Sequence, residues 1–357
     1  MVRRVEHGMN EQLAKIVSYL KDYDGPEIRL MEVCGTHTAA IFKGAIRSLI
    51  SPKIHLISGP GCPVCVTPAA FIDKCVEYAH MDGHVLYSFG DMLKVPGTAG
   101  SLSDHKGQGA HVEVVYSPFE VLEKAAAQPD VTHVVAAVGF ETTAPIYGLM
   151  IREMQEKDIH NVRLVTAIKT ILPALTWICD SQPEIDGFIC PGHVCVIIGS
   201  DPFLPLAEKY KKPFVVAGFE PEHLLVTIYD LVRQIEAGEH NVGNHYKNAV
   251  HAAGNPKALD VLEEYYTPGA AVWRGLGSIP DSGLYISEKY QEYDGGSLGL
   301  DQDIELPPAC RCADVITGRI NPADCPMFAS GSCTPTSPYG PCMVSAEGAC
   351  GIWYRNR

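Results

Sequence analysis

Residues 134–154, VVAAVGFETTAPIYGLMIREM, decide the fold of this protein. An apolar run rich in valine leads into a Gly-Phe-Glu turn, and an amphipathic helical pattern follows. A strand without polar alternation is typical of a parallel sheet that helices cover on both faces. Residues 214–235, FVVAGFEPEHLLVTIYDLVRQI, repeat this order. The repeat indicates either two units of duplicated architecture or only the strand–turn–helix order that is common in α/β proteins.

The same alternation extends over most of the chain. Apolar runs predict eight strands, at residues 28–33, 54–58, 84–89, 111–116, 132–140, 162–168, 187–190 and 213–219. Amphipathic patterns predict helices at residues 38–50, 69–80, 119–128 and 146–157. We therefore expect an α/β fold with two Rossmann-like parallel-sheet domains of similar architecture. The expected boundaries are an N-terminal helical segment at 1–27, α/β domains at 28–130 and 131–238, and a helical or irregular domain at 239–357.

Composition limits the possible environments and partners. With 357 residues, the chain is long enough for two or three domains. It has no apolar run long enough to cross a bilayer, and its first residues lack a signal-peptide core. We therefore expect a cytoplasmic protein with no membrane partner. The net charge of −14 argues against nucleic acid, because no basic stripe is present to neutralise phosphates.

Cysteine is concentrated near the C-terminus. Of 13 cysteines, six lie in the tail, at positions 310, 312, 325, 333, 342 and 350. In a reducing compartment such a set indicates metal or redox chemistry rather than a disulfide framework. Zinc ribbons usually present CxxC pairs, and this tail has none. We expect a C-terminal iron–sulfur domain with one [4Fe–4S] cluster. The evenly spaced Cys325, Cys333, Cys342 and Cys350 are the expected ligands, with Cys312 as the substitute; zinc and unrelated buried thiols are the alternatives.

A second chemical motif is MEVCGTHTAAIF, residues 31–42. It places Cys34 between a predicted strand and a predicted helix, where backbone N–H groups and the helix dipole favour a thiolate. A thiolate binds metals and attacks electrophiles. His37 is the nearest proton donor, proton acceptor or further ligand. The alternative is a buried structural cysteine beside a helix-capping Thr36.

A third motif is SGPGCPVCVTP, residues 58–68. Gly59, Pro60 and Gly61 predict a turn after a strand, and Cys62 and Cys65 form a CxxC pair ahead of a predicted helix. Thioredoxin-like proteins use this arrangement for a disulfide that forms and opens. We expect both cysteines to occupy exposed turn positions. The motif by itself does not separate redox chemistry from metal binding.

Polar residues also follow several other predicted strands. They are Asp91, Glu141, Thr142, Thr143 and His193. Open α/β sheets bind ligands outside the carboxyl ends of their strands, so these residues together predict a cleft lined by Cys34, Cys62 and Cys65. Taken singly, each is equally well explained by helix capping or turn chemistry.

Five motifs together, CGTH, GPGCPVCVTP, GFETTAP, PGHVCVIIG and CTPTSPYGPCMVSAEGAC, resemble the HypD family of hydrogenase maturation proteins. The resemblance extends from about residue 30 to the C-terminus. It implies a scaffold with redox activity that assembles the Fe(CN)2CO group of [NiFe] hydrogenases. It also implies a complex with a HypC-type small chaperone and a HypE-type cyanide donor protein. Cys34 would then bind the iron, Cys62 and Cys65 would be the redox pair, and the [4Fe–4S] cluster would relay electrons.

Two other classes of function fit parts of the sequence. A free-standing, cluster-dependent thiol–disulfide oxidoreductase accounts for the CxxC pair and the cysteine-rich tail, but gives Cys34 and His37 no role. A structural iron–sulfur protein without chemistry is a third class.

Overall fold

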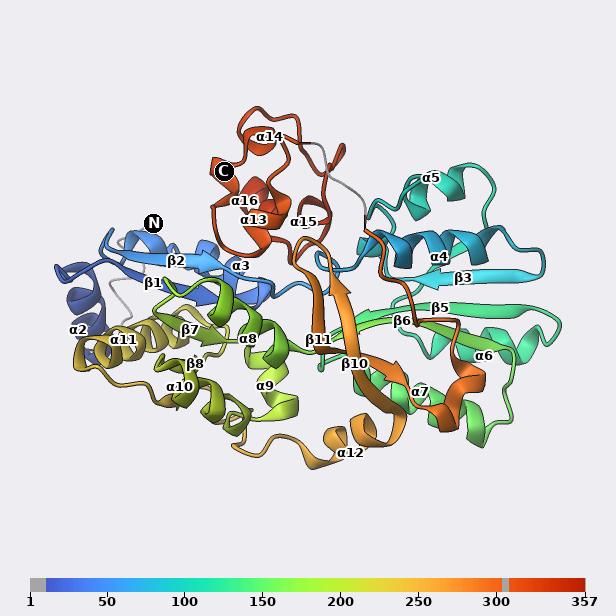
Figure 1. Ribbon diagram of the computed structural model, residues 1–357, viewed down its shortest axis with the longest axis horizontal. Coiled ribbons are helices and arrows are strands. Elements are labelled where there is room, and N and C mark those ends of the chain that lie inside the picture. The colour runs from blue at the N-terminus through green and yellow to red at the C-terminus, as the bar shows by residue number, and fades with distance from the viewer. Residues whose placement is uncertain (1–10, 304–307, 357) are drawn as a thin grey trace. The chain divides into compact units, whose positions relative to one another are not determined.

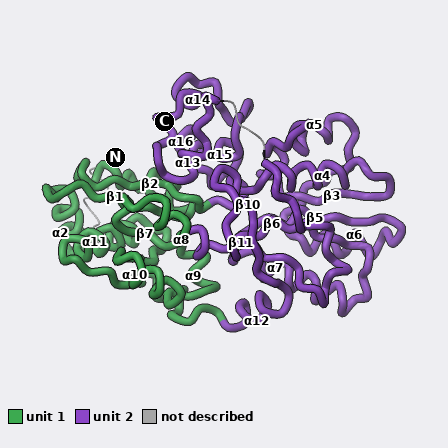
Figure 2. Tube along the Cα trace, viewed as in Figure 1, with its two compact units in different colours: residues 1–61, 175–255, 356 green, residues 62–174, 256–355, 357 purple. Residues whose placement is uncertain are grey.

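The computed structural model describes residues 11–303 and 308–356. Its internal contacts divide the chain into two compact units, drawn in green and purple in Figure 2. Of the described residues, unit 1 contains 11–61, 175–255 and 356, and unit 2 contains 62–174 and 256–355. Each unit therefore combines two long, separate segments of the sequence.

Unit 1 is built on a five-stranded parallel sheet with the order β2-β1-β7-β8-β9 (Figure 1). Its strands are β1 (Ile28–Glu32), β2 (Ile54–Ser58), β7 (Gly187–Cys190), β8 (Phe214–Val216) and β9 (Val242–Asn244). Its helices are α2 (Glu11–Lys21), α3 (Gly35–Lys43), α9 (Gly192–Ile198), α10 (Leu204–Tyr210) and α11 (Pro221–Ala237). The core joins Leu20, Ile41 and Leu224 from the helices with Leu30 and Val215 from the sheet.

Unit 2 is built on a six-stranded sheet with the order β10-β11-β6-β5-β3-β4. Its strands are β3 (His84–Ser88), β4 (Val112–Val114), β5 (Thr132–Gly139), β6 (Val162–Lys169), β10 (Tyr266–Trp273) and β11 (Gly277–Ile286). Four strands are parallel, and the β10–β11 hairpin adds to β6 in the antiparallel direction. The main helices are α4 (Ala69–His80), α5 (Leu102–Gly107), α6 (Glu120–Ala127), α7 (Ala144–Glu156) and α12 (Pro256–Tyr265).

The cysteine-rich tail belongs to unit 2 by its contacts. It forms four short helices, α13 (Cys312–Ile316), α14 (Pro326–Ala329), α15 (Pro341–Val344) and α16 (Ala349–Arg355). Figure 1 shows them gathered in one small group, joined by irregular loops. The structure does not separate this tail as a third compact unit, although the sequence predicted a separate domain there.

The two units share one strand order. In unit 1 the first strand lies between the second and the third, as β2-β1-β7-β8, and in unit 2 the corresponding order is β4-β3-β5-β6. This supports two Rossmann-like units of similar architecture. The repeated sequence segments do not occupy equivalent places, however, because β5 is the third parallel strand of unit 2 and β8 is the fourth of unit 1. The sequence repeat therefore reflects only the strand–turn–helix order that is common in α/β proteins. What the two units share is the order of their strands.

All eight predicted strands are present, with small shifts at their ends. The predicted helix at 38–50 instead starts at Gly35 and stops at Lys43, and a 3-10 turn follows at Ile46–Ser48. Ala45 has a left-handed φ of 51° that interrupts the helix. The segment expected to be helical or irregular contains the β10–β11 hairpin, which glycines, prolines and an irregularity between Gly269 and Ala271 concealed.

The chain crosses between the units after residues 61, 174 and 255, rather than at the expected boundaries near 130 and 238. The last part of α8 (Ile171–Ser181) thus belongs to unit 1. The boundaries differ from those expected because β1 pairs with β7, a strand more than 150 residues later in the chain. A strand pattern identifies strands but not their partners. Part of the predicted segment 1–27 lies outside the described residues, and the rest contains α2.

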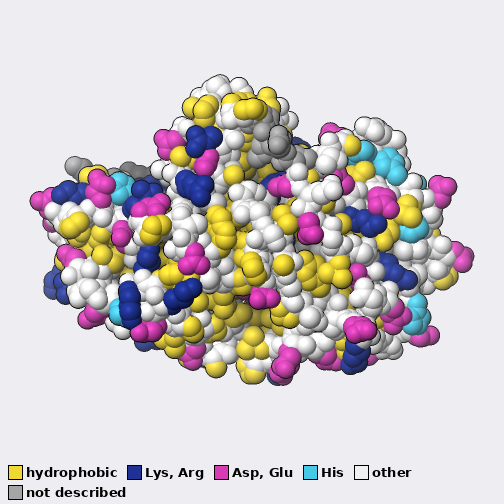
Figure 3. Space-filling view, viewed as in Figure 1, with side chains coloured by type: hydrophobic (Ala, Val, Ile, Leu, Met, Phe, Trp, Pro, Cys, Tyr) yellow, Lys and Arg dark blue, Asp and Glu magenta, His cyan; other side chains and the backbone are white. Residues whose placement is uncertain are grey.

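Among the described residues, no helix has the length and apolar character needed to cross a bilayer. Figure 3 shows acidic and basic side chains interspersed on the visible face, with no stripe of basic residues.

Candidate functional site

The topological switch point of unit 1 lies between β1 and β7, where strand order reverses and open α/β sheets bind ligands. After β1, Cys34 adopts an extended conformation (φ −152°, ψ 120°) as the residue that precedes α3. Its side chain makes no capping hydrogen bond, and Cys34 is 7% exposed. The expected place of Cys34 at the end of a strand and the start of a helix is therefore confirmed.

A buried carboxyl group supports the turn around Cys34. Glu32 Oε2 accepts a hydrogen bond of 3.1 Å from the Cys34 backbone N–H, and Glu32 Oε1 accepts one from the Thr38 hydroxyl. Burial raises the pKa of Glu32 to about 7, against the opposing effect of these hydrogen bonds. The sequence analysis missed Glu32, although an acidic residue at the end of the apolar strand IRLME was a usable signal.

A glycine turn lies directly against Cys34. Gly59 N–H donates to the Glu32 carbonyl at 2.7 Å, and Gly35 N–H donates to the Gly61 carbonyl at 3.4 Å. A Cβ atom at Gly61 would stand only 2.3 Å from Cys34 N, so this position accepts no side chain. The backbone that leads into the CPVC motif therefore passes against the backbone of Cys34.

His37 is fully buried at the same end of the unit 1 sheet. Its Nε2 lies 3.3 Å from the Ala217 carbonyl oxygen, and its Nδ1 has no partner among the described residues. Desolvation lowers the pKa of His37 to about 4, so the ring is neutral at physiological pH. With Nε2 donating to Ala217, Nδ1 is an available acceptor. Phe219 stacks on His193 and makes a tilted ring contact with His37, at centroid distances of 4.0 and 4.9 Å.

Cys62 and Cys65 form a disulfide, with their Cα atoms 5.3 Å apart. Both residues are buried, at 5% and 2% exposure, so the expectation that they are exposed turn positions is wrong. They also do not start a helix, because α4 begins only at Ala69. Local hydrogen bonds hold the turn instead: Cys65 N–H donates to Cys62 Sγ at 3.2 Å, and the Thr67 hydroxyl donates to the Pro63 carbonyl at 2.9 Å.

The predicted strand-end residues divide between the two units. Cys34, His37 and His193 belong to unit 1, and Asp91, Glu141, Thr142 and Thr143 belong to unit 2. In unit 2 these four follow β3 and β5, the pair of strands at its own switch point. A single cleft lined by both sets, with Cys62 and Cys65, stays a prediction.

Two acidic groups of unit 2 have clear structural roles. Glu141 Oε1 accepts a 2.8 Å hydrogen bond from Ile171 N–H, which ties the end of β5 to the start of α8. Asp91 is hydrogen-bonded to Ser345 of the cysteine-rich tail, and burial raises the pKa of Asp91.

Glu141 makes the stability of the protein depend on pH. Desolvation raises its pKa to about 7, and its Oε2 has no partner among the described residues. The unfolded pKa is lower, so folding becomes less favourable as pH rises from about 5 to 7. We expect this rise in pH to lower the free energy of unfolding by up to roughly 3 kcal/mol less in Glu141→Gln than in the wild type. Urea denaturation of both proteins at pH 5 and pH 8 measures this difference. If the variant shows the same pH dependence as the wild type, Glu141 is not its source.

Cysteines of the tail line one pocket. Its walls contain five thiols, together with Phe328, Gly340 and Met343: Cys310, Cys312, Cys325, Cys333 and Cys350. All five are buried except Cys310, which is half-buried. Cys342 is also buried and does not line the pocket, but its thiol is hydrogen-bonded to those of Cys312 and Cys350. Its Sγ also accepts a 3.2 Å hydrogen bond from Cys350 N–H.

Burial also sets the protonation of these thiols. It raises the pKa of Cys333, and it raises the pKa of Cys310 to about 12. Without a bound cation they are therefore protonated at neutral pH. Within residues 11–303 and 308–356, no three Cys, His, Asp or Glu side chains are arranged to hold a single metal ion. The pocket thus offers several separate sulfur atoms around one space.

These features define a thiol-rich α/β protein with a disulfide turn and a cysteine-lined pocket. The HypD family model, described as "Hydrogenase formation hypA family", matches residues 8–357. Hydrogenase maturation factor HypD of Escherichia coli (strain K12) is 38% identical, over 99% of this chain and 97% of its own length. A putative hydrogenase expression/formation protein of Methanocaldococcus jannaschii is 38% identical, over 93% and 92%. HypD of Azotobacter vinelandii is 40% identical, over 92% and 89%. The chain therefore belongs to the HypD family of hydrogenase maturation factors.

Proposed function

We propose that this chain is a scaffold and redox protein on which the Fe(CN)2CO group of [NiFe] hydrogenases is assembled. The observation that supports the proposal is the turn in which Gly61, the residue that precedes Cys62, passes against the backbone of Cys34 at the switch point of unit 1. The proposed redox pair, Cys62 and Cys65, therefore follows directly on a chain segment that contacts the proposed iron ligand, Cys34. Other hydrogenase maturation proteins are the expected partners, with a HypC-type chaperone and a HypE-type cyanide donor as the specific proposals.

Cys34 is the proposed ligand of the iron that is being assembled. A low-spin iron with cyanide and carbonyl ligands prefers soft thiolate donors. Cys34 precedes the first turn of α3, where N–H groups and the helix dipole favour the thiolate. The neutral His37, three residues later, offers Nδ1 as a hydrogen-bond acceptor that can orient a ligand. A single protein thiolate holds the group loosely enough for later transfer.

Cys62 and Cys65 are the proposed redox pair. Their Cα separation of 5.3 Å lies within the usual range for a disulfide. Reduction takes two electrons and two protons and gives two thiols, while re-oxidation returns the electrons to the bound iron group or its donor. Because both residues are buried, electrons are better supplied through the protein than by a soluble thiol, which needs direct access to sulfur.

A [4Fe–4S] cluster in the tail pocket is the proposed electron relay. Each thiolate of such a cluster binds a different iron, so its ligands surround a space rather than a point, as the pocket thiols do. We propose Cys312, Cys325, Cys333 and Cys350 as ligands. We choose Cys312 rather than Cys342 because, of these two, only Cys312 lines the pocket. We choose Cys312 rather than Cys310 because Cys312 is buried at the start of α13, whereas Cys310 is half-buried. Phe328 and Met343 would shield the cluster from water.

Serine substitutions of the CPVC pair test the redox role. We expect Cys62→Ser and Cys65→Ser each to abolish hydrogenase maturation, because neither variant can form the disulfide. Alkylation of free thiols under denaturing conditions, read by mass spectrometry, should show one additional reactive cysteine in each single variant compared with the oxidised protein. Cys75→Ser, which changes a buried thiol of α4 in the same unit, is the control and should mature hydrogenase normally. Normal maturation by the Cys62→Ser, Cys65→Ser double variant would show that the pair is only structural.

A further inference from the structure

A buried arginine at the tip of the β10–β11 hairpin lies beside the segment that follows the CPVC pair. Arg274 comes directly after β10 and is 2% exposed. Its backbone N–H donates to the Val66 carbonyl at 2.8 Å. At the same tip, a Cβ atom on Gly275 would stand 2.8 Å from the Cβ of Ala313, the residue after Cys312. The hairpin tip therefore contacts the chain next to both proposed redox groups of unit 2.

The Arg274 side chain reaches two further segments of unit 2. Its Nη2 donates to the Pro96 carbonyl at 3.0 Å, and its Nε lies 3.2 Å from Asp303 Oδ1. Its Nη1 has no hydrogen-bond partner among the residues that the structure describes. A planar guanidinium holds two acceptors in fixed directions, whereas an ammonium is a single point of charge. Arg274 therefore fixes the segment that contains Asp303 relative to the loop that contains Pro96.

Asp303 extends this contact to the start of helix α4. Its Oδ1 accepts a 3.1 Å hydrogen bond from the N–H of Ala69, the first residue of α4. Pro68, which precedes the helix, makes no side-chain capping bond, so Asp303 takes the place of a local cap. The Gln302 carbonyl accepts a second bond, from Ala70 N–H at 3.0 Å. The chain between the CPVC pair and α4 is therefore held by segments that lie far along the sequence.

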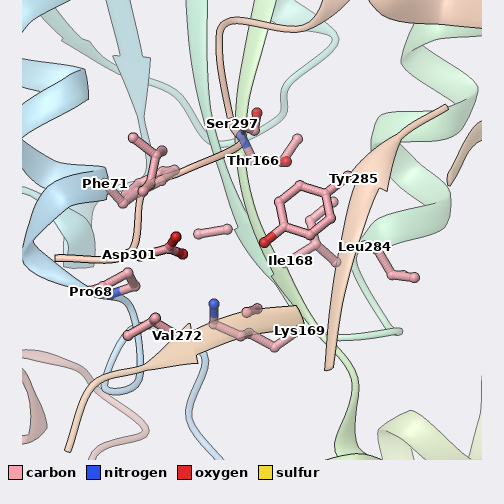
Figure 4. A pocket seen from close by; sticks show the side chains of 13 residues that line it. Pro68, Phe71, Thr166, Ile168, Lys169, Val272, Leu284, Tyr285, Ser297 and Asp301 are labelled. Carbon is pink, nitrogen blue, oxygen red and sulfur yellow. Dashed lines mark hydrogen bonds between the residues drawn. The ribbon is translucent and has the colours of Figure 1, made fainter. Parts of the chain in front are cut away.

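The same segments meet around the small pocket that Figure 4 shows. Pro68 before α4, Val272 of β10 and Asp301 in the segment before Asp303 all line this pocket. Their side chains lie close to one another on one side of it (Figure 4). The hairpin and the segment that contains Asp303 thus pack together beside the start of α4.

We propose that Arg274 and Asp303 are positioning residues for the redox pair, which hold the CPVC turn in its disulfide conformation and so lower the reduction potential of Cys62 and Cys65. The inference rests on the proposed redox role of that pair. Closing a disulfide costs the conformational freedom of the turn, and an anchor that restricts the turn beforehand reduces this cost. Stability alone does not account for a buried arginine, because apolar side chains of similar volume often stabilise a core as well as an ion pair does.

The sign of the effect separates anchoring from charge. A cation near the pair favours thiolates, so the loss of its charge alone should lower the reduction potential. Loss of the anchor should instead raise the potential, because the disulfide then closes against a freer turn. We expect the second effect to be the larger one, since the Arg274 charge is paired with Asp303.

Equilibration of the full-length protein with mixtures of reduced and oxidised dithiothreitol measures the potential. Dithiothreitol closes to its cyclic disulfide and gives two electrons and two protons to the pair, which opens to two thiols. Each mixture is approached anaerobically from oxidised and from reduced protein. Alkylation of the peptide that contains both cysteines is then read by mass spectrometry. Arg274→Met should favour the dithiol about tenfold over the wild type, a rise of about 30 mV for this two-electron couple.

Two further variants make the result specific. The Arg274→Met, Asp303→Ala double variant removes both charges, so that no unpaired charge stays buried, and it should show the same rise in potential. Arg152→Met is the matched control, because Arg152 belongs to α7 of the same unit and pairs with Glu264 at 3.5 Å. It should leave the potential of the pair unchanged.

Three outcomes would overturn the inference. The wild-type potential in both Arg274 variants, or a fall in potential, would show that Arg274 and Asp303 do not position the turn. Either result would leave the redox role of Cys62 and Cys65 intact. A wild-type pair that stays closed in every mixture would overturn that redox role itself, and the inference with it.

Discussion

Replacing Cys325 with Ser is expected to remove the [4Fe–4S] cluster and to unfold the cysteine-rich tail. The tail contains short helices of four to seven residues joined by loops, so little buried apolar surface holds it without a metal centre. Anaerobically prepared wild type should contain about four irons per chain at the cluster. In Cys325→Ser the iron content and the visible charge-transfer absorption should both be lost. Limited proteolysis should then cut within residues 308–356, while both sheets remain resistant.

Cys342→Ser is the matched control for this experiment. Cys342 is as buried as Cys325 and lies in the same tail, but it does not line the pocket. It should keep the full cluster absorption, whereas Cys312→Ser should lose it. If Cys342→Ser loses the cluster and Cys312→Ser keeps it, the evenly spaced set of four ligands is right and the set proposed from the pocket is wrong. Stoichiometric zinc without visible absorption would contradict the cluster altogether.

Cys34→Ala should abolish hydrogenase maturation while it leaves the cluster unchanged. The iron group would lose its proposed ligand from this chain, which is more severe than the roughly 10- to 100-fold loss caused by removing an outer partner of a metal ligand. Cluster absorption should persist, because the tail thiols belong to unit 2 and Cys34 to unit 1. Hydrogenase activity in cells that carry each variant measures the first effect, and the visible spectrum of the purified variant measures the second.

The control for Cys34→Ala is Cys179→Ala. Cys179 is another buried thiol of unit 1, in α8, and it has no place in the proposed chemistry. It should mature hydrogenase normally if it folds. Equal losses in the two variants would show that Cys34 acts through packing rather than as a ligand.

Much of the fold follows from local sequence patterns. Strands such as β5 and β6 are continuous apolar runs, and only a strand buried on both faces gives that pattern. The β10–β11 hairpin was not predictable in this way, because Pro268, Gly269 and Gly283 interrupt its alternation. The discontinuous units were missed because the pairing of β1 with β7 depends on contacts between distant segments.

The candidate site was predictable where it consists of cysteines, because cysteine is rare and chemically reactive. Cys34, Cys62, Cys65 and the tail cysteines stand out in type and spacing. The burial of the CPVC pair was missed, because exposure depends on packing by residues far along the chain; Arg274 N–H, for example, donates to the Val66 carbonyl at 2.8 Å. The choice between Cys312 and Cys342 as a cluster ligand stays a prediction, because even spacing in the sequence favours Cys342 and the lining of the pocket favours Cys312. Glu32 was missed although it is the last residue of a largely apolar strand.

Infrared spectroscopy tests the central claim most directly, that the iron group is assembled on this chain. The wild-type protein would be co-purified anaerobically with a HypC-type small chaperone, and the Cys34→Ala variant in parallel. The account predicts cyanide and carbonyl stretching bands in the wild-type complex and their absence in Cys34→Ala. A wild-type complex with disulfide reductase activity but without these bands would contradict the scaffold and would favour a free-standing thiol–disulfide oxidoreductase. Full bands in Cys34→Ala would show that another residue holds the iron.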